Sequence, residues 1–527
     1  MMLILDCFRE GVDADEFPMT VRRVNSRRND LVSMALTYRA WCDPALDILW
    51  RTQVSLRPLL RTFPEDLWKE ITNVAVIQRR TDPSTVCHNY MELARDVVPA
   101  DWSRPLLYAR RINTFVFTGE GLPPSVCNAG AVHHTALSTI LRTAPAEGLL
   151  PNLLELIADK IPLSLFGSRI DSYGPWILSM SNPNLRLLSL SHHVVPEAEF
   201  SSLVDAIFSK CCDLETFRIR YHYRLGPTVM LSSSQVSQLR RLRSLQLSSL
   251  EYVKPSPLSP DTTISFGLLE TLREAEFNHV DAITHACNTY HGDLFIGLQK
   301  LRLQAITLMQ CTSLISVLST TQLEEITLSA IAPRSRSFHD VFECLAKQPS
   351  RIHKLRSLIF ILRGLQPEEN ASDSPSIFQP LLSGSFCTLR RLEVKIKNDK
   401  FPENITLALD AIPDALPLIE ILNFPYFNVP GVTFETILHL ANRCVYLKVL
   451  GIGLGDSNIP VISSEETPAL SLELLKVGHS AIPSGHPGEI ALFFQKWFPN
   501  LRKLKASNAS MVVDEWEEIS RLLEVKM

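Results

Sequence analysis

A short apolar pattern that returns along most of the chain limits what this sequence can fold into. The pattern is Leu-x-x-Leu-x-Leu, and its copies begin on average about 30 residues apart from residue 112 onward. No single copy is long enough to bury its own apolar side chains, so neighbouring copies must stack against one another. Clear copies begin at Leu185, Leu242, Leu298, Leu323, Leu355, Leu389, Leu447 and Leu472, and looser copies begin at Ile112, Leu153, Leu214, Leu272, Ile419 and Leu501.

Each copy predicts a short strand that is followed by a helix. Alternate side chains of a strand point to opposite faces, so the last two apolar positions of a copy point into a common core. Between the copies, apolar residues return with helical spacing, as in Phe200, Leu203, Val204 and Ile207. The sequence therefore predicts an α/β fold, a leucine-rich repeat solenoid with a parallel inner sheet and outer helices over 111–527.

The composition excludes several kinds of partner. The chain has 527 residues and a formal net charge of −4, without a polybasic stretch, so we expect no nucleic acid and no membrane as a partner. Glycine is scarce, at 20 residues, which argues against glycine-rich phosphate loops.

Cysteine usage and the lengths of the apolar stretches indicate where the protein works. The 11 cysteines are an odd number without paired spacing, which is typical of reduced thiols inside a cell. The apolar residues 1–5 are too short for the core of a signal peptide, and no stretch approaches the roughly 20 apolar residues of a membrane-spanning helix. We therefore expect a cytoplasmic or nuclear location, or both.

Residues 1–55 do not follow the repeat and predict a small helical module. Residues 30–41 show helical spacing of apolar side chains. Asp43 and Pro44 then predict the start of a second short helix, because Asp is a favoured N-cap and Pro is favoured at the first helical position. Two short helices with bulky apolar residues on more than one side cannot bury all of them, so we expect the remainder to contact a partner.

Three stretches of this module carry a recognisable pattern, namely residues 30–41, 44–47 and 49–51. They resemble the F-box, and the chain as a whole resembles a fungal F-box protein with a C-terminal leucine-rich repeat solenoid. The resemblance implies a substrate-recognition subunit of a Skp–cullin–F-box E3 ubiquitin ligase. Such a subunit binds a Skp-type adaptor, and through it a cullin–RING ligase, with its F-box, and binds an unknown target protein with its repeats. The residues that match the F-box core and adaptor contact are Leu31, Ala35, Leu36, Trp41, Leu46, Leu49 and Trp50.

The resemblance also divides the chain. It implies an F-box-like helical module over 1–55, a helical linker or bridge over 56–110, and the irregular repeat solenoid over 111–527. An F-box opens with Leu-Pro, whereas only residues 3–8 could correspond here, so we expect the Leu-Pro to precede residue 1.

No motif in the sequence predicts catalysis. The adjacent Cys211 and Cys212 lack companions at metal-ligand spacing. Gly451, Gly453 and Gly455 follow a repeat copy without the spacing of a nucleotide loop, so they predict a tight turn between repeats. We therefore expect an adaptor or receptor subunit that is not an enzyme and that has no metal site and no cofactor.

The side chains that alternate with the buried leucines predict a second binding surface. They project from the inner face of the sheet, where they can contact the target. Basic members outnumber acidic members, which favours an acidic or phosphorylated target. The predicted target-binding residues are Arg218, Arg220, Gln246, Arg302, Gln304, Thr327, Glu393, Lys395 and Lys505.

A second hypothesis belongs to another functional class. The chain could be a non-ligase leucine-rich repeat scaffold for protein interactions, in which the F-box is degenerate. The two hypotheses differ in whether the N-terminal module binds a Skp-type adaptor.

Overall fold

The computed structural model forms two compact units, Met1–Pro257 and Leu258–Met527, and each is described by itself below. The structure describes residues 31–78, 83–116, 129–132, 134–158, 174–191, 197–221, 231–249, 259–278, 280–290, 292–305, 307–331, 335–348, 352–363, 379–396, 409–428, 432–454, 467–478, 480, 487–506 and 513–524.

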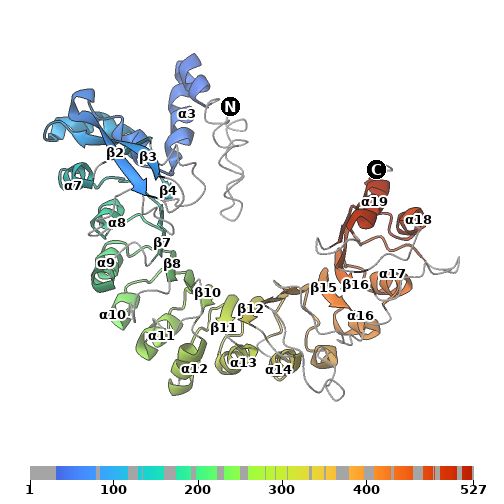
Figure 1. Ribbon diagram of the computed structural model, residues 1–527. Helices are drawn as coiled ribbons and strands as arrows, with labels where there is room; N and C mark the ends of the chain where they lie inside the picture. The colour runs from blue at the N-terminus through green and yellow to red at the C-terminus, as the bar shows by residue number, and fades with distance from the viewer. Residues whose placement is uncertain are drawn as a thin grey trace. The chain divides into compact units, whose positions relative to one another are not determined.

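The first unit contains a parallel sheet whose strands follow one another in chain order, with helices on one face (Figure 1). The helices are α7 (His134–Arg142), α8 (Gly174–Met180), α9 (Glu197–Lys210) and α10 (Ser233–Val236). The strands are β1 (Thr52–Gln53), β4 (Thr114–Val116), β6 (Glu155–Ala158), β7 (Leu187–Ser191), β8 (Thr216–Tyr221) and β9 (Ser244–Ser249).

The second unit repeats the same arrangement, and its strands are also parallel and in chain order. The strands are β10 (Glu274–Phe277), β11 (Lys300–Ala305), β12 (Glu325–Ile331), β13 (Ser357–Arg363), β14 (Arg391–Ile396), β15 (Ile421–Asn428), β16 (Val449–Gly453), β17 (Leu474–Gly478) and β18 (Lys503–Ala506). The helices are α11 (Pro260–Gly267), α12 (Val280–Thr289), α13 (Leu308–Val317), α14 (Ser335–Ala346), η6 (Gln379–Ser383), η7 (Leu409–Ala411), α16 (Ile412–Ala415), α17 (Phe434–Arg443), α18 (Pro487–Trp497) and α19 (Val513–Glu524).

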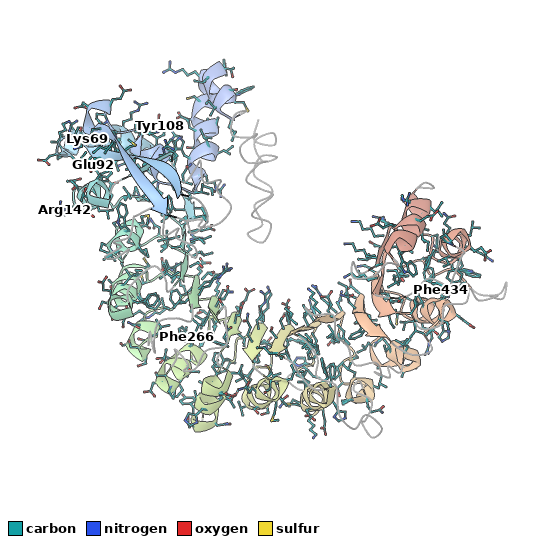
Figure 2. All side chains as sticks on the ribbon, viewed as in Figure 1. Lys69, Glu92, Tyr108, Arg142, Phe266 and Phe434 are labelled. Carbon is teal, nitrogen blue, oxygen red and sulfur yellow. The ribbon has the colours of Figure 1, made fainter. Side chains whose placement is uncertain are left out.

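The core of each unit lies between the strands and the helices. Phe266 on α11 and Phe434 on α17, both labelled in Figure 2, are fully buried on this side. In the ranges that the structure covers, no helix has both the length and the apolar character needed to cross a membrane.

The repeat predicted from the sequence is confirmed, and the fold is an α/β leucine-rich repeat solenoid. In all fourteen copies a strand begins two residues after the first apolar position of the pattern. These first positions are at most 4% exposed. In the copy that begins at Leu185, the later leucines Leu188 and Leu190 are also buried, as the alternation of a strand requires.

The helical bridge expected over 56–110 is wrong in its central part, which is a β-hairpin. Strands β2 (Trp68–Gln78) and β3 (Pro83–Leu93) pair in antiparallel fashion, and β5 (Ala129–Val132) pairs with β3. Strand β2 is rich in Val, Ile and Thr, whose branched side chains favour strands over helices. Helices occur only beside the hairpin, as α4 (Arg57–Leu60), η1 (Glu65–Leu67), η2 (Pro99–Trp102) and α5 (Ser103–Ala109).

A buried asparagine links neighbouring repeats of the first unit. The Asn182 side-chain amide donates to the carbonyl oxygens of Leu150 and Leu153, at 3.0 Å each. Its Oδ1 accepts the backbone N–H of Asn184 at 2.7 Å. Asn182 therefore satisfies backbone groups of the turn that precedes β6 as well as those of its own turn.

We expect Asn182→Ala to lower the stability of the first unit by about 2 kcal/mol, because it removes one donor from each of the Leu150 and Leu153 carbonyl groups. The Leu150 carbonyl keeps a second donor, the N–H of Leu153. The midpoint of urea unfolding measures this change. The matched control is Asn184→Ala, since the Asn184 side chain is exposed and its substitution should change the midpoint little. Equal effects of the two substitutions would contradict the role assigned to Asn182.

Candidate functional site

From residue 31 onward, where the structure describes the N-terminal module, two helices are separated at Tyr38. Residues 31–37 are helical, Tyr38 has extended backbone angles (φ −146°, ψ 125°), and α3 (Arg39–Arg51) follows. The break expected at Asp43 and Pro44 is therefore wrong, because Pro44 lies inside α3.

The Arg111 guanidinium stabilises α3 on both sides of Pro44. It donates to the carbonyl oxygen of Asp43 at 3.1 Å and to the Asp43 carboxylate at 2.7 Å, and it also binds the Asp47 carboxylate. Asp43 and Asp47 are one helical turn apart, so one cation can bind both carboxylates only when this segment is helical. These contacts also hold α3 against the chain that leads into the first repeat.

Two further contacts join α3 to the repeats. The ring of Trp50 lies against the ring of Tyr108, with 4.6 Å between the centroids, and Trp50 is only 9% exposed. Directly after α3, Thr52 and Gln53 of β1 pair with Thr114 and Phe115 of β4. The module therefore continues the sheet of the first unit through β1.

The bridge between the module and the repeats is held by a charged network. The Arg95 guanidinium binds both carboxylate oxygens of Asp101, at 2.8 and 2.9 Å, and binds Asp66 at 2.7 Å. These hydrogen bonds lower the pKa of Asp66 and of Asp101. Asp101 also accepts the N–H of Val98 at 2.9 Å, so the network connects both ends of the hairpin with η2.

The structure separates the predicted adaptor-contact residues into two groups. Leu31 and Trp50 are buried, and Ala35, Leu46 and Leu49 are half-buried. Of these five, Trp50 packs against Tyr108 of α5.

Leu36 and Trp41 project into solvent, and two neighbours that the sequence analysis did not select do the same. Leu36 is 82% exposed, Tyr38 62%, Val32 40% and Trp41 38%. We call these four residues the exposed apolar segment. The rings of Tyr38 and Trp41 contact each other edge to face at 6.1 Å. Four large apolar side chains exposed within ten residues form a surface suited to a protein partner.

The face of the sheet opposite the helices, which we call the open face, holds all nine predicted target-binding residues. Among them Arg302, Lys395 and Lys505 are exposed, whereas Thr327 and Glu393 are buried. Strand register brings Arg218 next to Gln246 in the first unit and Arg302 next to Thr327 in the second. Their contact with a target stays a prediction.

The open face of the second unit has a basic end that the sequence analysis found only in part. Register aligns Glu393, Asn423, Gly451, Lys476 and Lys505 on the consecutive strands β14 to β18. Asn423, Gly451 and Lys476 were not among the predicted residues. Aligning all copies of the repeat would have found them, because each occupies the position between the last two apolar residues of its copy.

The tight turn predicted at the glycines is wrong for Gly451 and Gly453, which both lie in strand β16, while Gly455 is outside the described residues.

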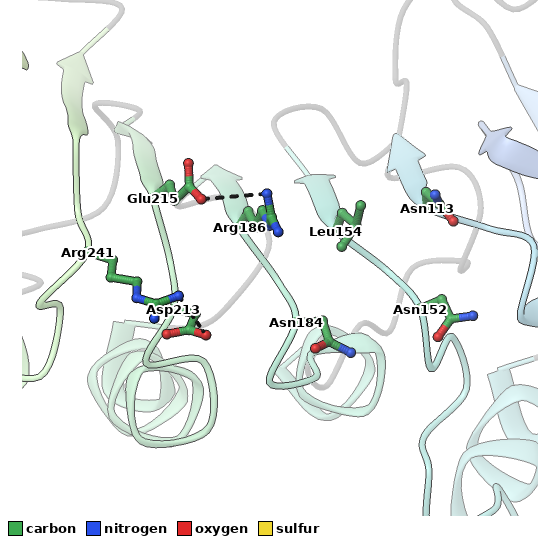
Figure 3. A pocket seen from close by; sticks show the side chains of 8 residues that line it. All are labelled: Asn113, Asn152, Leu154, Asn184, Arg186, Asp213, Glu215 and Arg241. Carbon is green, nitrogen blue, oxygen red and sulfur yellow. Dashed lines mark ion pairs between the residues drawn. The ribbon is translucent and has the colours of Figure 1, made fainter.

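A polar hollow of about 320 Å³ lies in the first unit, where the strands begin (Figure 3). Two ion pairs cross it, Arg186 with Glu215 at 3.8 Å and Arg241 with Asp213 at 3.2 Å. Each pair joins one positive and one negative side chain, so the two pairs together add no net charge to the hollow. The other side chains that line it are Asn113, Asn152, Leu154 and Asn184.

One group of side chains on α14 has the composition of a metal site. One potential ligand atom from each of His339, Asp340 and Glu343 lies within 4.8 Å of the others. Glu343, however, is bound by Lys347 at 2.7 Å, and this hydrogen bond lowers the Glu343 pKa. All three groups belong to one helix, and this arrangement is that of a surface ion-pair network.

Comparisons with known proteins describe the fold alone. No family model matches the sequence, and no curated protein sequence matches it. Among solved structures, the chain is similar to the TLR13–ssRNA13 complex, with 16% identity and a TM-score of 0.37 over 79% of this chain and 57% of that chain. It is also similar to the complex of Rad7 and Elc1 in yeast, with 13% identity and a TM-score of 0.33 over 71% of this chain and 77% of that chain. The chain spans little more than half of the length of the TLR13 chain. The assignment to the leucine-rich repeat fold rests on the order of the strands and on their register.

Proposed function

We propose that this protein is a substrate-recognition subunit of a Skp–cullin–F-box E3 ubiquitin ligase. The N-terminal module binds a Skp-type adaptor, and the open face of the repeats binds the target protein. The observation that carries the proposal is the exposed apolar segment, because Leu36 and Trp41 belong both to the F-box-like pattern and to the solvent-exposed surface.

The attachment of the module supports this role. A receptor must hold its target in a defined position relative to the adaptor, which requires a firm connection between the two binding surfaces. The Trp50–Tyr108 contact, the Arg111 contacts and the β1–β4 pairing supply such a connection between α3 and the first repeats.

The state of the thiols supports a cytoplasmic or nuclear location. Cys211, Cys311 and Cys444 are free and buried in the repeats. Burial raises the pKa of Cys211 to about 12 and that of Cys444 to about 11, so both remain protonated thiols at neutral pH. Free buried thiols are typical of proteins in reducing compartments.

We expect Leu36→Asp in the full chain to weaken binding to a purified Skp-type adaptor by at least about tenfold, since a carboxylate would replace an apolar contact. Biolayer interferometry measures the dissociation constant. The matched control is Leu107→Asp on α5, because Leu107 is 62% exposed and lies outside the module. This control should bind the adaptor like the wild type.

Two outcomes would contradict the proposal. If the wild-type chain does not bind the adaptor at micromolar concentration, the non-ligase scaffold with a degenerate F-box is the better assignment. If Leu36→Asp and Leu107→Asp weaken binding equally, the exposed apolar segment is not the docking surface.

A further inference from the structure

Three buried polar atoms without hydrogen-bond partners lie on consecutive strands of the open face of the second unit. They are Ser357 Oγ on β13, Arg391 Nε on β14 and Asn423 Oδ1 on β15. Ser357 pairs in register with Arg391 of β14. Asn423 pairs in register with Glu393, which also lies on β14. Leaving such an atom unpaired in the interior destabilises a protein, and native proteins rarely do so. Their concentration in one place indicates that a ligand supplies hydrogen bonds here.

Gly451 makes room for the side-chain amide of Asn423. The two residues are neighbours in register across β15 and β16. A Cβ atom at position 451 would lie 2.0 Å from Asn423 Oδ1 and 3.0 Å from its Cγ, so no other residue fits without a shift of the amide. The Asn423 amide therefore lies over Gly451, whose register partner on the other side is Lys476 of β17.

Positively charged side chains lie on the strands on both sides of Asn423 and Gly451. The Glu393 carboxylate is bound by Arg391 at 3.0 Å and by Lys395 at 3.3 Å. Lys476 and Lys505, the next two residues along the row, form no ion pair with any described residue. One carboxylate therefore stands among four cations, and the excess charge lies on the side of Gly451.

The protonation of Lys476 responds to the same surroundings. Burial lowers its pKa, and the charges of Lys505, Lys395 and Arg391 lower it further against the opposite effect of Glu393. An incoming anion would reverse this effect by stabilising the ammonium form.

An apolar strip runs beside the row. Ile421, Val449 and Leu474 are neighbours in register on β15, β16 and β17, and each lies two residues before Asn423, Gly451 or Lys476. All three are half-buried on the open face. Two residues along a strand correspond to about 7 Å, which matches the distance between alternate side chains of an extended peptide.

We propose that the surface formed by Asn423, Gly451, Lys476, Lys505 and the apolar strip binds an extended acidic segment of a protein partner, in which a carboxylate side chain lies two residues from an aliphatic one, on the same face of the segment. The carboxylate binds Lys476 and Lys505, a backbone N–H of the segment donates to Asn423 Oδ1, and the aliphatic side chain covers the strip. An inorganic anion fits less well, because it has no donor for Asn423 and no apolar group. This assignment rests on the target-binding half of the proposed function and is independent of adaptor docking.

The test uses the full chain and a fluorescein-labelled short peptide that repeats Leu-Ser-Glu-Ser, with both ends blocked, so that leucine and glutamate share one face of the extended peptide. Fluorescence anisotropy should show that this peptide binds at least about tenfold more tightly than the matched peptide in which glutamine replaces glutamate. Lys476→Gln should weaken binding of the acidic peptide by about fivefold or more. Lys496→Gln, which removes an exposed cation from α18 on the helix side of the same unit, should change it less than about twofold.

Each alternative result overturns the assignment. Equal affinity for the two peptides, no binding of the acidic peptide, or equal effects of Lys476→Gln and Lys496→Gln would each do so. Tighter binding of a short oligo-uridine than of the acidic peptide would assign the surface to nucleic acid instead. Thermal melts verify that both variants fold. Two further measurements separate this proposal from the role of the N-terminal module in adaptor binding. Lys476→Gln should leave adaptor binding unchanged, and Leu36→Asp should leave binding of the acidic peptide unchanged.

Discussion

Replacing Phe360 by alanine is expected to lower the free energy of unfolding of the second unit by about 4 kcal/mol, because the change opens a large cavity in the core. Phe360 lies on β13 and is fully buried. Its ring contacts Phe338 at 5.1 Å and Phe342 at 5.5 Å, and both partners belong to α14, which precedes the strand. The contact between a strand and its helix is the unit from which the whole fold is built, so its loss should affect the neighbouring repeats as well.

Urea unfolding of the purified chain, followed by far-ultraviolet circular dichroism, measures this effect. The matched control is Ile361→Ala, since Ile361 is the next residue of β13, lies on the open face and is only half-buried. It should destabilise the unit by less than half as much. Equal destabilisation by the two substitutions would show that the helix side of the sheet is not the principal core.

The sequence predicted the repeats well because burial imposes one rule on every copy. A strand between two neighbours must direct alternate side chains toward the helices, and the fourteen copies therefore keep the same apolar spacing. Strand β1 was missed because Thr52 and Gln53 are too short a stretch to show any period. The resemblance implies a helical bridge where the hairpin lies, and of the two strands only β2 is rich in the branched residues that favour a strand.

The functional surfaces were predicted less completely. Alternation alone placed residues such as Arg302 and Lys505 on the open face. It could not indicate Gly451, whose importance lies in the absence of a side chain, or the amide of Asn423, which matters because it lacks a partner. In the N-terminal module, a helical pattern gives no information about which side of a helix the rest of the chain covers. Trp50 and Trp41 therefore looked equivalent in the sequence, although Tyr108 covers only the former.

This difference between the two tryptophans leads to the second large effect that we expect. Trp50→Ala should lower the free energy of unfolding of the first unit by about 3–4 kcal/mol, because a buried indole is removed from its contact with Tyr108. The same substitution should also reduce adaptor binding, but only by loosening α3 from the first repeat. Hydrogen exchange of the amides in α3 should therefore become faster in this variant.

Trp41→Ala is the matched control, since it removes the same side chain from the solvent-exposed side of the same helix. It should lower the stability of the first unit less than Trp50→Ala does and leave exchange in α3 slow, because Trp41 is 38% exposed and less buried surface is lost. It should nevertheless weaken adaptor binding as Leu36→Asp does. If Trp50→Ala instead keeps the stability and exchange of the wild type and still loses the adaptor, Trp50 contacts the adaptor directly. The division of the module into a buried anchor and an exposed docking surface would then be wrong.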